Sequence, residues 1–96
     1  MKSYVDQCDR AIVAAVSAQR SEFDLHAVLR IFMQRNQQLY VALLTAAPGE
    51  WRFHRVHCFL GRRIARLCGG LGYAGEATRS RDIFGQWSQC RKWSRR

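Results

Sequence analysis

The chain has 96 residues, 48% of them hydrophobic and 24% charged, and its formal net charge is +9. This length suits one domain with a small core, and the composition is typical of a globular protein and excludes an intrinsically disordered one. We therefore expect a single domain over residues 1–96. Its first residues include two aspartates and no long apolar run, so neither a signal peptide nor a membrane span is expected.

Basic residues concentrate in the second half of the chain. Residues 1–50 carry five bases and five acids, whereas residues 51–96 carry eleven bases and only Glu76 and Asp82 as acids. Fourteen of the sixteen bases are arginine, which makes forked hydrogen bonds to phosphates and guanine edges. This asymmetry favours a phosphate-facing surface, although an acidic protein partner would fit it equally well.

The four cysteines, Cys8, Cys58, Cys68 and Cys90, form no C-x-x-C pair. Free thiols are typical of a reducing compartment, and we expect the protein to be cytoplasmic.

Helices are expected in the first half. Ser3–Asp6 has the S-x-x-D spacing of a helix start and predicts a helix over about residues 4–19. Ser21–Asp24 repeats this signal and predicts a second helix that ends near Arg35. The amino-terminal segment, residues 1–20, would either close the core or provide a homodimer contact.

A third helix is expected after Asn36, which can act as its cap, although residues 22–46 could instead form one kinked helix. We prefer two helices. Ala47–Glu50 predicts a turn, because Pro48 ends the helical pattern and Gly49 permits a positive φ.

The segment 51–68 divides into three faces when it is wound as a helix. The expected core face comprises Phe53, Val56, Leu60, Ile64 and Leu67, with His57 and Cys68 at its edge. A second face carries Arg52, Arg55, Arg62, Arg63 and Arg66, with Phe59 among them. His54, Cys58, Gly61 and Ala65 form the third face. We expect Trp51 to plug the core beside the helix start.

A basic β-hairpin is expected after Gly69–Gly70, which should end this helix. The predicted strands are residues 78–84 and 87–93, joined by a turn at Gly85–Gln86. Trp87, Gln89, Arg91 and Trp93 should share one face of the hairpin, with one tryptophan packed under the sheet. Residues 94–96 should fray.

The predicted fold is α+β and mainly α, with three to four helices followed by a carboxy-terminal hairpin. This order resembles the winged-helix class of helix-turn-helix DNA-binding domains, over roughly residues 22–96. The resemblance implies a helix-turn-helix core at residues 22–70 and a wing at residues 71–96, with the last helix in the major groove and the wing on flanking DNA.

The predicted nucleic-acid-binding residues are Arg52, Arg55, Phe59, Arg62, Arg63, Arg66, Arg79, Arg81, Arg91 and Lys92. Three roles are open for Phe59: a base contact, a protein interface, or packing against the wing. The leading hypothesis is a small DNA-binding protein, either a transcriptional regulator or a replication or mobile-element accessory factor. The alternatives are an inhibitor or adaptor that docks on an acidic partner protein, and an RNA-binding protein.

No enzymatic activity is expected, because the sequence shows neither a phosphate-binding glycine loop before a helix nor a convergent pair of carboxylates. His54, His57 and Cys58 are spaced so that they could converge on zinc with Cys68 or Cys90, but the spacing matches no common zinc motif. We expect neither a metal nor a cofactor there.

Overall fold

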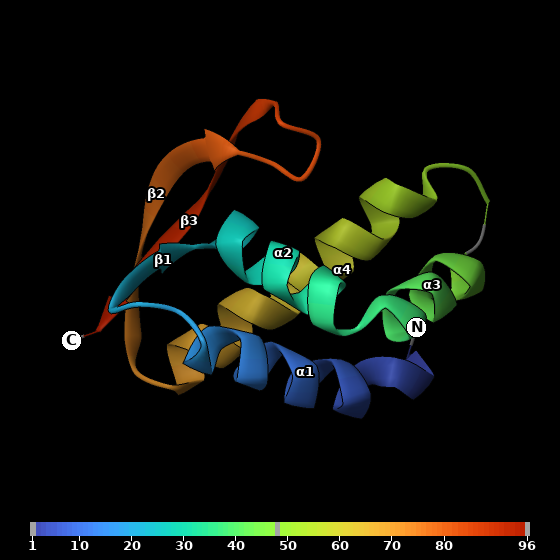
Figure 1. Cartoon of the computed structure of the whole chain (residues 1–96), viewed down its shortest axis with the longest axis horizontal. Helices are drawn as coiled ribbons and strands as arrows, with labels where there is room; N and C mark the ends of the chain where they lie inside the picture. Colours follow the sequence, from blue (N-terminus) through green and yellow to red (C-terminus); the bar gives the residue numbers. More distant parts are fainter. Residues whose placement is uncertain (1, 48, 96) are drawn as a thin grey trace.

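The computed structural model describes residues 2–47 and 49–95, the last of these by its backbone only. Its elements are η1 (Lys2–Tyr4), α1 (Val5–Ser17), β1 (Glu22–Asp24), α2 (Leu25–Arg35), α3 (Gln37–Ala46), α4 (Arg52–Gly70), β2 (Tyr73–Arg81) and β3 (Trp87–Arg95). The fold is α+β and mainly α, as predicted. The helices lie together on one side of the molecule, and the sheet closes the other end (Figure 1).

Helices α1, α2 and α4 enclose the core, because each presents a continuous apolar stripe to the other two. From α1 the fully or nearly fully buried residues are Cys8, Ile12, Ala15 and Val16, and from α4 they are Val56, Leu60, Ile64 and Cys68. Helix α2 adds Val28, Leu29 and Phe32. Helix α1 therefore closes the core, which is one of the two roles considered for it.

The prediction that a helix starts at residues 21–24 is wrong, because α2 begins only at Leu25. Residues Glu22–Asp24 form the short strand β1, and only Asp24 serves as the helix cap: its Oδ1 accepts a hydrogen bond from the backbone N–H of Ala27 at 2.8 Å. The capping signal was therefore correct in kind but displaced by one turn. Phe23 points into the core from this strand.

The prediction of separate second and third helices is confirmed, with a break at Asn36. The amide side chain of Asn36 does not cap α3. Its Nδ2 instead donates to the Phe32 carbonyl at 3.0 Å, which closes the end of α2. Of the predicted turn at 47–50, residue 48 lies outside the described residues.

Helix α4 runs two residues beyond its predicted end. Gly69 and Gly70 are helical, and the chain turns at Gly72, whose φ of +89° is a conformation that favours glycine. The backbone N–H groups of Leu71 and Gly72 satisfy carbonyls of the last helical turn.

The three strands form one antiparallel sheet in the order β1-β3-β2. The hairpin prediction is confirmed in kind but is shifted: β2 begins at Tyr73, and residues 82–86 form the loop. Asp82 organises this loop, because its Oδ1 accepts the backbone N–H groups of Phe84 and Gln86. Ser94, expected to fray, pairs with both Glu22 and Ala74.

One tryptophan anchors the sheet to the helices. Trp93 is 2% exposed and pairs with Phe23 on one side and Gly75 on the other. A Cβ at Gly75 would lie only 2.9 Å from the Trp93 indole nitrogen, so glycine makes room for the ring. The expectation that one hairpin tryptophan packs under the sheet is confirmed.

Among the helices of the described residues, none combines the length and the apolarity needed to cross a bilayer.

Candidate nucleic-acid interface

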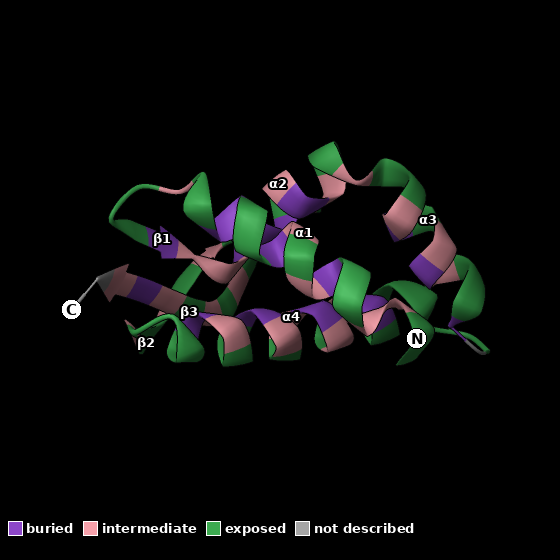
Figure 2. Cartoon of the chain, turned by 90° about the horizontal axis from the view of Figure 1, so that it is seen from below, coloured by how far each residue is buried: buried purple, intermediate pink, exposed green. Residues whose placement is uncertain are grey.

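Four arginines of α4 lie along the helix edge opposite its buried stripe. Arg52, Arg55, Arg62 and Arg66 are all exposed, whereas the opposite edge is buried against the other helices (Figure 2). None of the four forms a salt bridge within the described residues. The helical periodicity that placed them together was therefore correct, and their guanidinium groups are open to an anionic partner.

Arg63 does not belong to this exposed row. Its Nε donates to Asp9 Oδ1 at 2.9 Å, and its Nη2 donates to Asp9 Oδ2. The side chains of Arg63 and Asp9 are 22% and 24% exposed, and the hydrogen bond to Asp9 raises the pKa of Arg63. The assignment of Arg63 to the binding surface is corrected on this ground, because its charge is neutralised inside the molecule.

Phe59 lies partly buried and packs against the core. The residue is adjacent to the arginines along the helix, but the buried side of its ring contacts apolar residues. Of the three roles, packing fits this position, and the partner is the core.

The hairpin contributes three further exposed arginines, Arg79, Arg81 and Arg91, which share the strand face of Trp87. The Arg81 guanidinium lies over the Trp87 ring at 5.2 Å from its centroid and donates to the Gly85 carbonyl at 2.8 Å. The Arg30 guanidinium donates to the Arg81 carbonyl. These contacts hold the loop in place and pair an exposed aromatic ring with a cation.

Lys92 is the second predicted residue that the structure takes out of the binding surface. Its Nζ lies 3.0 Å from a Glu76 oxygen and 3.3 Å from a Glu22 oxygen. These two carboxylates raise its pKa. Lys92 therefore joins β1, β3 and β2 across one face of the sheet, and its charge is locally compensated.

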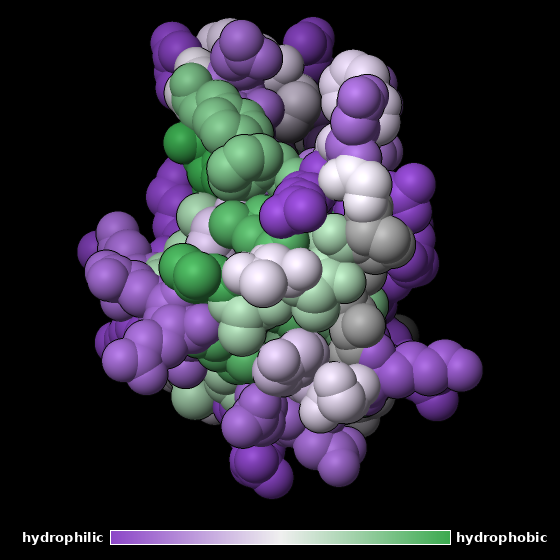
Figure 3. Space-filling view, turned by 90° about the vertical axis from the view of Figure 1, so that its right-hand side faces the viewer, coloured by the Kyte–Doolittle hydropathy of each residue, from purple (hydrophilic) through white to green (hydrophobic). Residues whose placement is uncertain are grey.

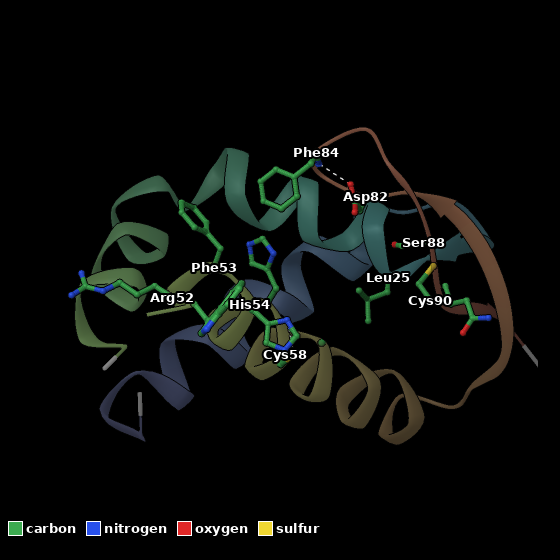
Figure 4. Close-up of a pocket in the computed structure, with 13 residues that line it drawn as sticks. Leu25, Arg52, Phe53, His54, Cys58, Asp82, Phe84, Ser88 and Cys90 are labelled. Carbon is green, nitrogen blue, oxygen red and sulfur yellow. Dashed lines mark hydrogen bonds between the residues drawn. The ribbon is translucent and has the colours of Figure 1, made fainter. Parts of the chain in front are cut away.

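A groove of about 860 Å³ opens between the first half of α4 and the hairpin loop (Figure 4). Phe53 and Phe84 meet across it edge to face, with ring centroids 6.3 Å apart, and they are 53% and 63% exposed. Phe53 was expected in the core, and this prediction is wrong: its ring lies in the groove against Phe84 and His57.

Trp51 also departs from its predicted role. It is 76% exposed and lines the groove instead of plugging the core. Its φ of +65° is unusual for a residue with a Cβ, and this conformation directs the chain into α4. Because Pro48 and Gly49 precede it, an irregular helix start was foreseeable, but the outward direction of the indole was not.

His57 forms the inner wall of the groove. Its Nε2 is 2.7 Å from the Tyr40 hydroxyl, and its ring stacks on the Tyr40 ring at 5.8 Å. Burial lowers the pKa of His57, and Asp82 acts in the opposite direction. Neutral histidine is therefore favoured at this position.

The residues considered for zinc do not converge. Cys58 Sγ lies 3.6 Å from His54 Nε2 on the exposed surface, while Cys68 is buried in the core and His57 bonds to Tyr40. Burial raises the pKa values of Cys8 and Cys68 to about 11, so both behave as apolar core residues.

Apolar surface continues beyond the groove. Figure 3 shows a band of hydrophobic atoms between hydrophilic edges on the end of the molecule where α3 and the start of α4 lie. Val41, Phe53 and Phe84 are among the exposed large apolar side chains. Sequence reasoning missed this surface, because exposure of Phe53 and Phe84 depends on where the hairpin loop meets α4.

Searches of protein-family models, of curated proteins and of solved structures find no match to this chain.

Proposed function

We propose that this protein binds nucleic acid, with duplex DNA as the leading partner, through the exposed arginines of α4 and the hairpin. The binding residues in this proposal are Arg52, Arg55, Arg62 and Arg66 from α4 and Arg79, Arg81 and Arg91 from the hairpin. A role in transcription, replication or a mobile element would follow from such binding.

One observation carries the proposal: four guanidinium groups lie along one exposed edge of a helix whose opposite edge is fixed in the core. The described acids that form salt bridges compensate Arg63 and Lys92 and none of these four. Arginines held on a rigid helix contact successive phosphates without a large ordering cost, and phosphate contacts provide affinity that is largely independent of sequence.

The element order adds fold-level support. A basic helix that leads directly into a basic hairpin fits the proposed resemblance to winged-helix domains, in which the helix enters the major groove and the wing lies beside it. This support is by analogy, since a fold does not define a function.

The test is binding of the full chain to random duplex, single-stranded DNA and RNA over a range of salt concentrations. We expect log K to fall by about 0.9 per phosphate contact with each unit of log salt for the duplex. The reversal Arg62→Glu with Arg66→Glu should abolish binding and leave the far-ultraviolet circular dichroism unchanged.

A matched control has the same change in net charge at exposed arginines elsewhere, Arg10→Glu with Arg35→Glu. This control should keep most of its affinity. Equal loss in both double variants would mean that net charge alone drives binding, and unchanged binding in the α4 variant would refute the proposal.

A protein-interaction module is the second candidate, and the groove favours it. Three exposed aromatic residues, Trp51, Phe53 and Phe84, line an open apolar groove beside Arg52. Such a surface suits an acidic partner with apolar anchor residues. A pulldown that survives nuclease treatment and is lost in Phe53→Ala with Phe84→Ala would support this candidate over nucleic acid.

A further inference from the structure

Three potential metal ligands of different chemistry meet where the hairpin touches the β1–α2 junction. A carboxylate oxygen of Asp24, a ring nitrogen of His26 and the sulfur of Cys90 all lie within 4.8 Å of one another. They come from the end of β1, the first turn of α2 and the middle of β3. Of these three residues, only Cys90 was among those that the sequence suggested for zinc.

We propose that Asp24, His26 and Cys90 bind a divalent zinc-type ion. Thiolate, imidazole and carboxylate are the three ligand types that zinc takes in proteins, and one position of a tetrahedron is left for water. In a tetrahedral site, neighbouring ligand atoms are about 3.5 Å apart, so the three atoms need to approach by roughly 1 Å.

The charges balance at this site. A thiolate and a carboxylate together neutralise a dication, and His26 binds in its neutral form. Binding releases the Cys90 thiol proton to solvent, so affinity falls as the pH is lowered. The nearest cation on this sheet face, Lys92, is already paired with Glu22 and Glu76.

The surroundings of His26 suit a ligand. The residue is 5% exposed, its Nδ1 lies 2.6 Å from Ser80 Oγ, and its Nε2 lies 3.2 Å from Ser88 Oγ. One ring nitrogen can leave its hydroxyl for the metal while the other keeps its partner, which fixes the ring orientation as in many metal sites. Ser80 also lies 3.6 Å from Cys90 Sγ.

Asp24 can serve the metal without giving up its role in the fold. Its Oδ1 caps α2 through the Ala27 N–H, and its second oxygen accepts no hydrogen bond from the described residues. A bound ion would therefore connect the capped end of α2 to β3, and it would fix the hairpin relative to the helices.

The test uses the full chain after removal of metal with a chelator. Titration with Zn²⁺ should show one saturable site, and zinc at about 100 times its Kd should raise Tm by about 10–20 °C. Titration with Co²⁺ should give thiolate-to-cobalt charge-transfer absorption, which requires a cysteine ligand.

Two variants test the assigned ligands. Cys90→Ser should remove the charge-transfer band, and Asp24→Asn should weaken zinc binding by at least about tenfold. Asparagine is also a good helix cap, so Asp24→Asn should still fold. The matched control is Cys58→Ser, which removes an exposed thiol beside His54 and should leave both the band and the affinity unchanged.

Three results would overturn the proposal. These are no saturable zinc binding by the unmodified chain, a charge-transfer band that survives in Cys90→Ser, or a band that is lost in Cys58→Ser. The measurements need no nucleic acid, so they are independent of the proposed function.

Discussion

The Asp9 carboxylate and the Arg63 guanidinium join α1 to α4 through a two-pronged hydrogen-bonded ion pair. The pair divides the arginines of α4 into one that stabilises the fold and four that remain open to a partner. Arg62 and Arg63 are neighbours in sequence but differ in their contacts: Arg63 is paired with Asp9, whereas Arg62 is exposed and forms no salt bridge within the described residues.

We expect Arg63→Gln to lower Tm, because it leaves the Asp9 carboxylate partly buried without its partner. The slope of log K against log salt for duplex DNA should stay unchanged. Arg62→Gln should leave Tm unchanged and reduce that slope by about 0.9, the contribution of one phosphate contact. A similar loss of slope in both variants would contradict this division.

Gly75→Ala should destabilise the sheet. The new methyl group would lie 2.9 Å from the Trp93 indole nitrogen and 3.1 Å from Arg91 Cδ, and the buried ring has little room to move. Overpacking of this kind costs about 1–3 kcal/mol, measurable by urea unfolding.

Gly69→Ala is the matched control. Gly69 lies in the last turn of α4, and an added Cβ meets no atom within 4 Å. Alanine should therefore stabilise the chain by up to about 1 kcal/mol, because it is the better helix former. Equal changes in the free energy of unfolding for Gly75→Ala and Gly69→Ala would contradict the close contact between Gly75 and the Trp93 ring.

Stability should fall as the pH is lowered through the ordinary histidine range. Burial lowers the pKa of His57 in the folded state, so below about pH 6.5 the unfolded chain binds a proton that the folded chain resists. The stability that the folded chain gains from neutral His57 is fully present above about pH 6.5. It is lost as the pH falls from that value to the lower pKa of His57 in the folded state. The free energy of unfolding, measured by urea titration from pH 5 to 8, should show this loss.

His57→Gln should remove this part of the pH dependence and leave the effect of the carboxylates. Tyr40→Phe keeps the stacked ring but deletes the hydroxyl that lies 2.7 Å from Nε2. Tyr40→Phe should therefore lower the free energy of unfolding, and this free energy should still fall as the pH is lowered. A His57→Gln profile parallel to that of the unmodified chain would contradict the assignment.

The thiols should react in a fixed order with a disulfide reagent. Cys58 is exposed and should react first, whereas Cys8 and Cys68 are fully buried with pKa values raised to about 11. Their labelling at neutral pH should wait for unfolding. Cys58→Ser should eliminate the fast phase, and rapid reaction of Cys68 in the native state would contradict the core described above.

Helical periodicity predicted much of the fold. The apolar spacing of α4 identified most of its buried residues, and alternation in the hairpin correctly grouped Trp87 with Trp93. Both predictions depend on residues close together in sequence. The geometry of the helix or strand fixes the relative directions of their side chains.

Long-range pairings were not predictable in the same way. Strand β1 forms where Phe23 pairs with Trp93, and both side chains are buried. A strand of three residues is too short for its sequence pattern to predict it. Arg63 and Lys92 carry the same positive charge as their sequence neighbours Arg62 and Arg91. Only the positions of Asp9, Glu22 and Glu76 distinguish them.

The pairing of β1 with β3 also constrains how the chain reaches its native state. Phe23 and Glu22 pair with Trp93 and Ser94, which follow them by about 70 residues along the chain. Closing such a long loop is slow compared with forming a local helix, so the helices should assemble first and the sheet last. A ribosome-bound chain synthesised only as far as Gly85 would lack Trp93 and should thus expose Phe23 to chaperones, and deletion of β3 should be more damaging than its few residues suggest.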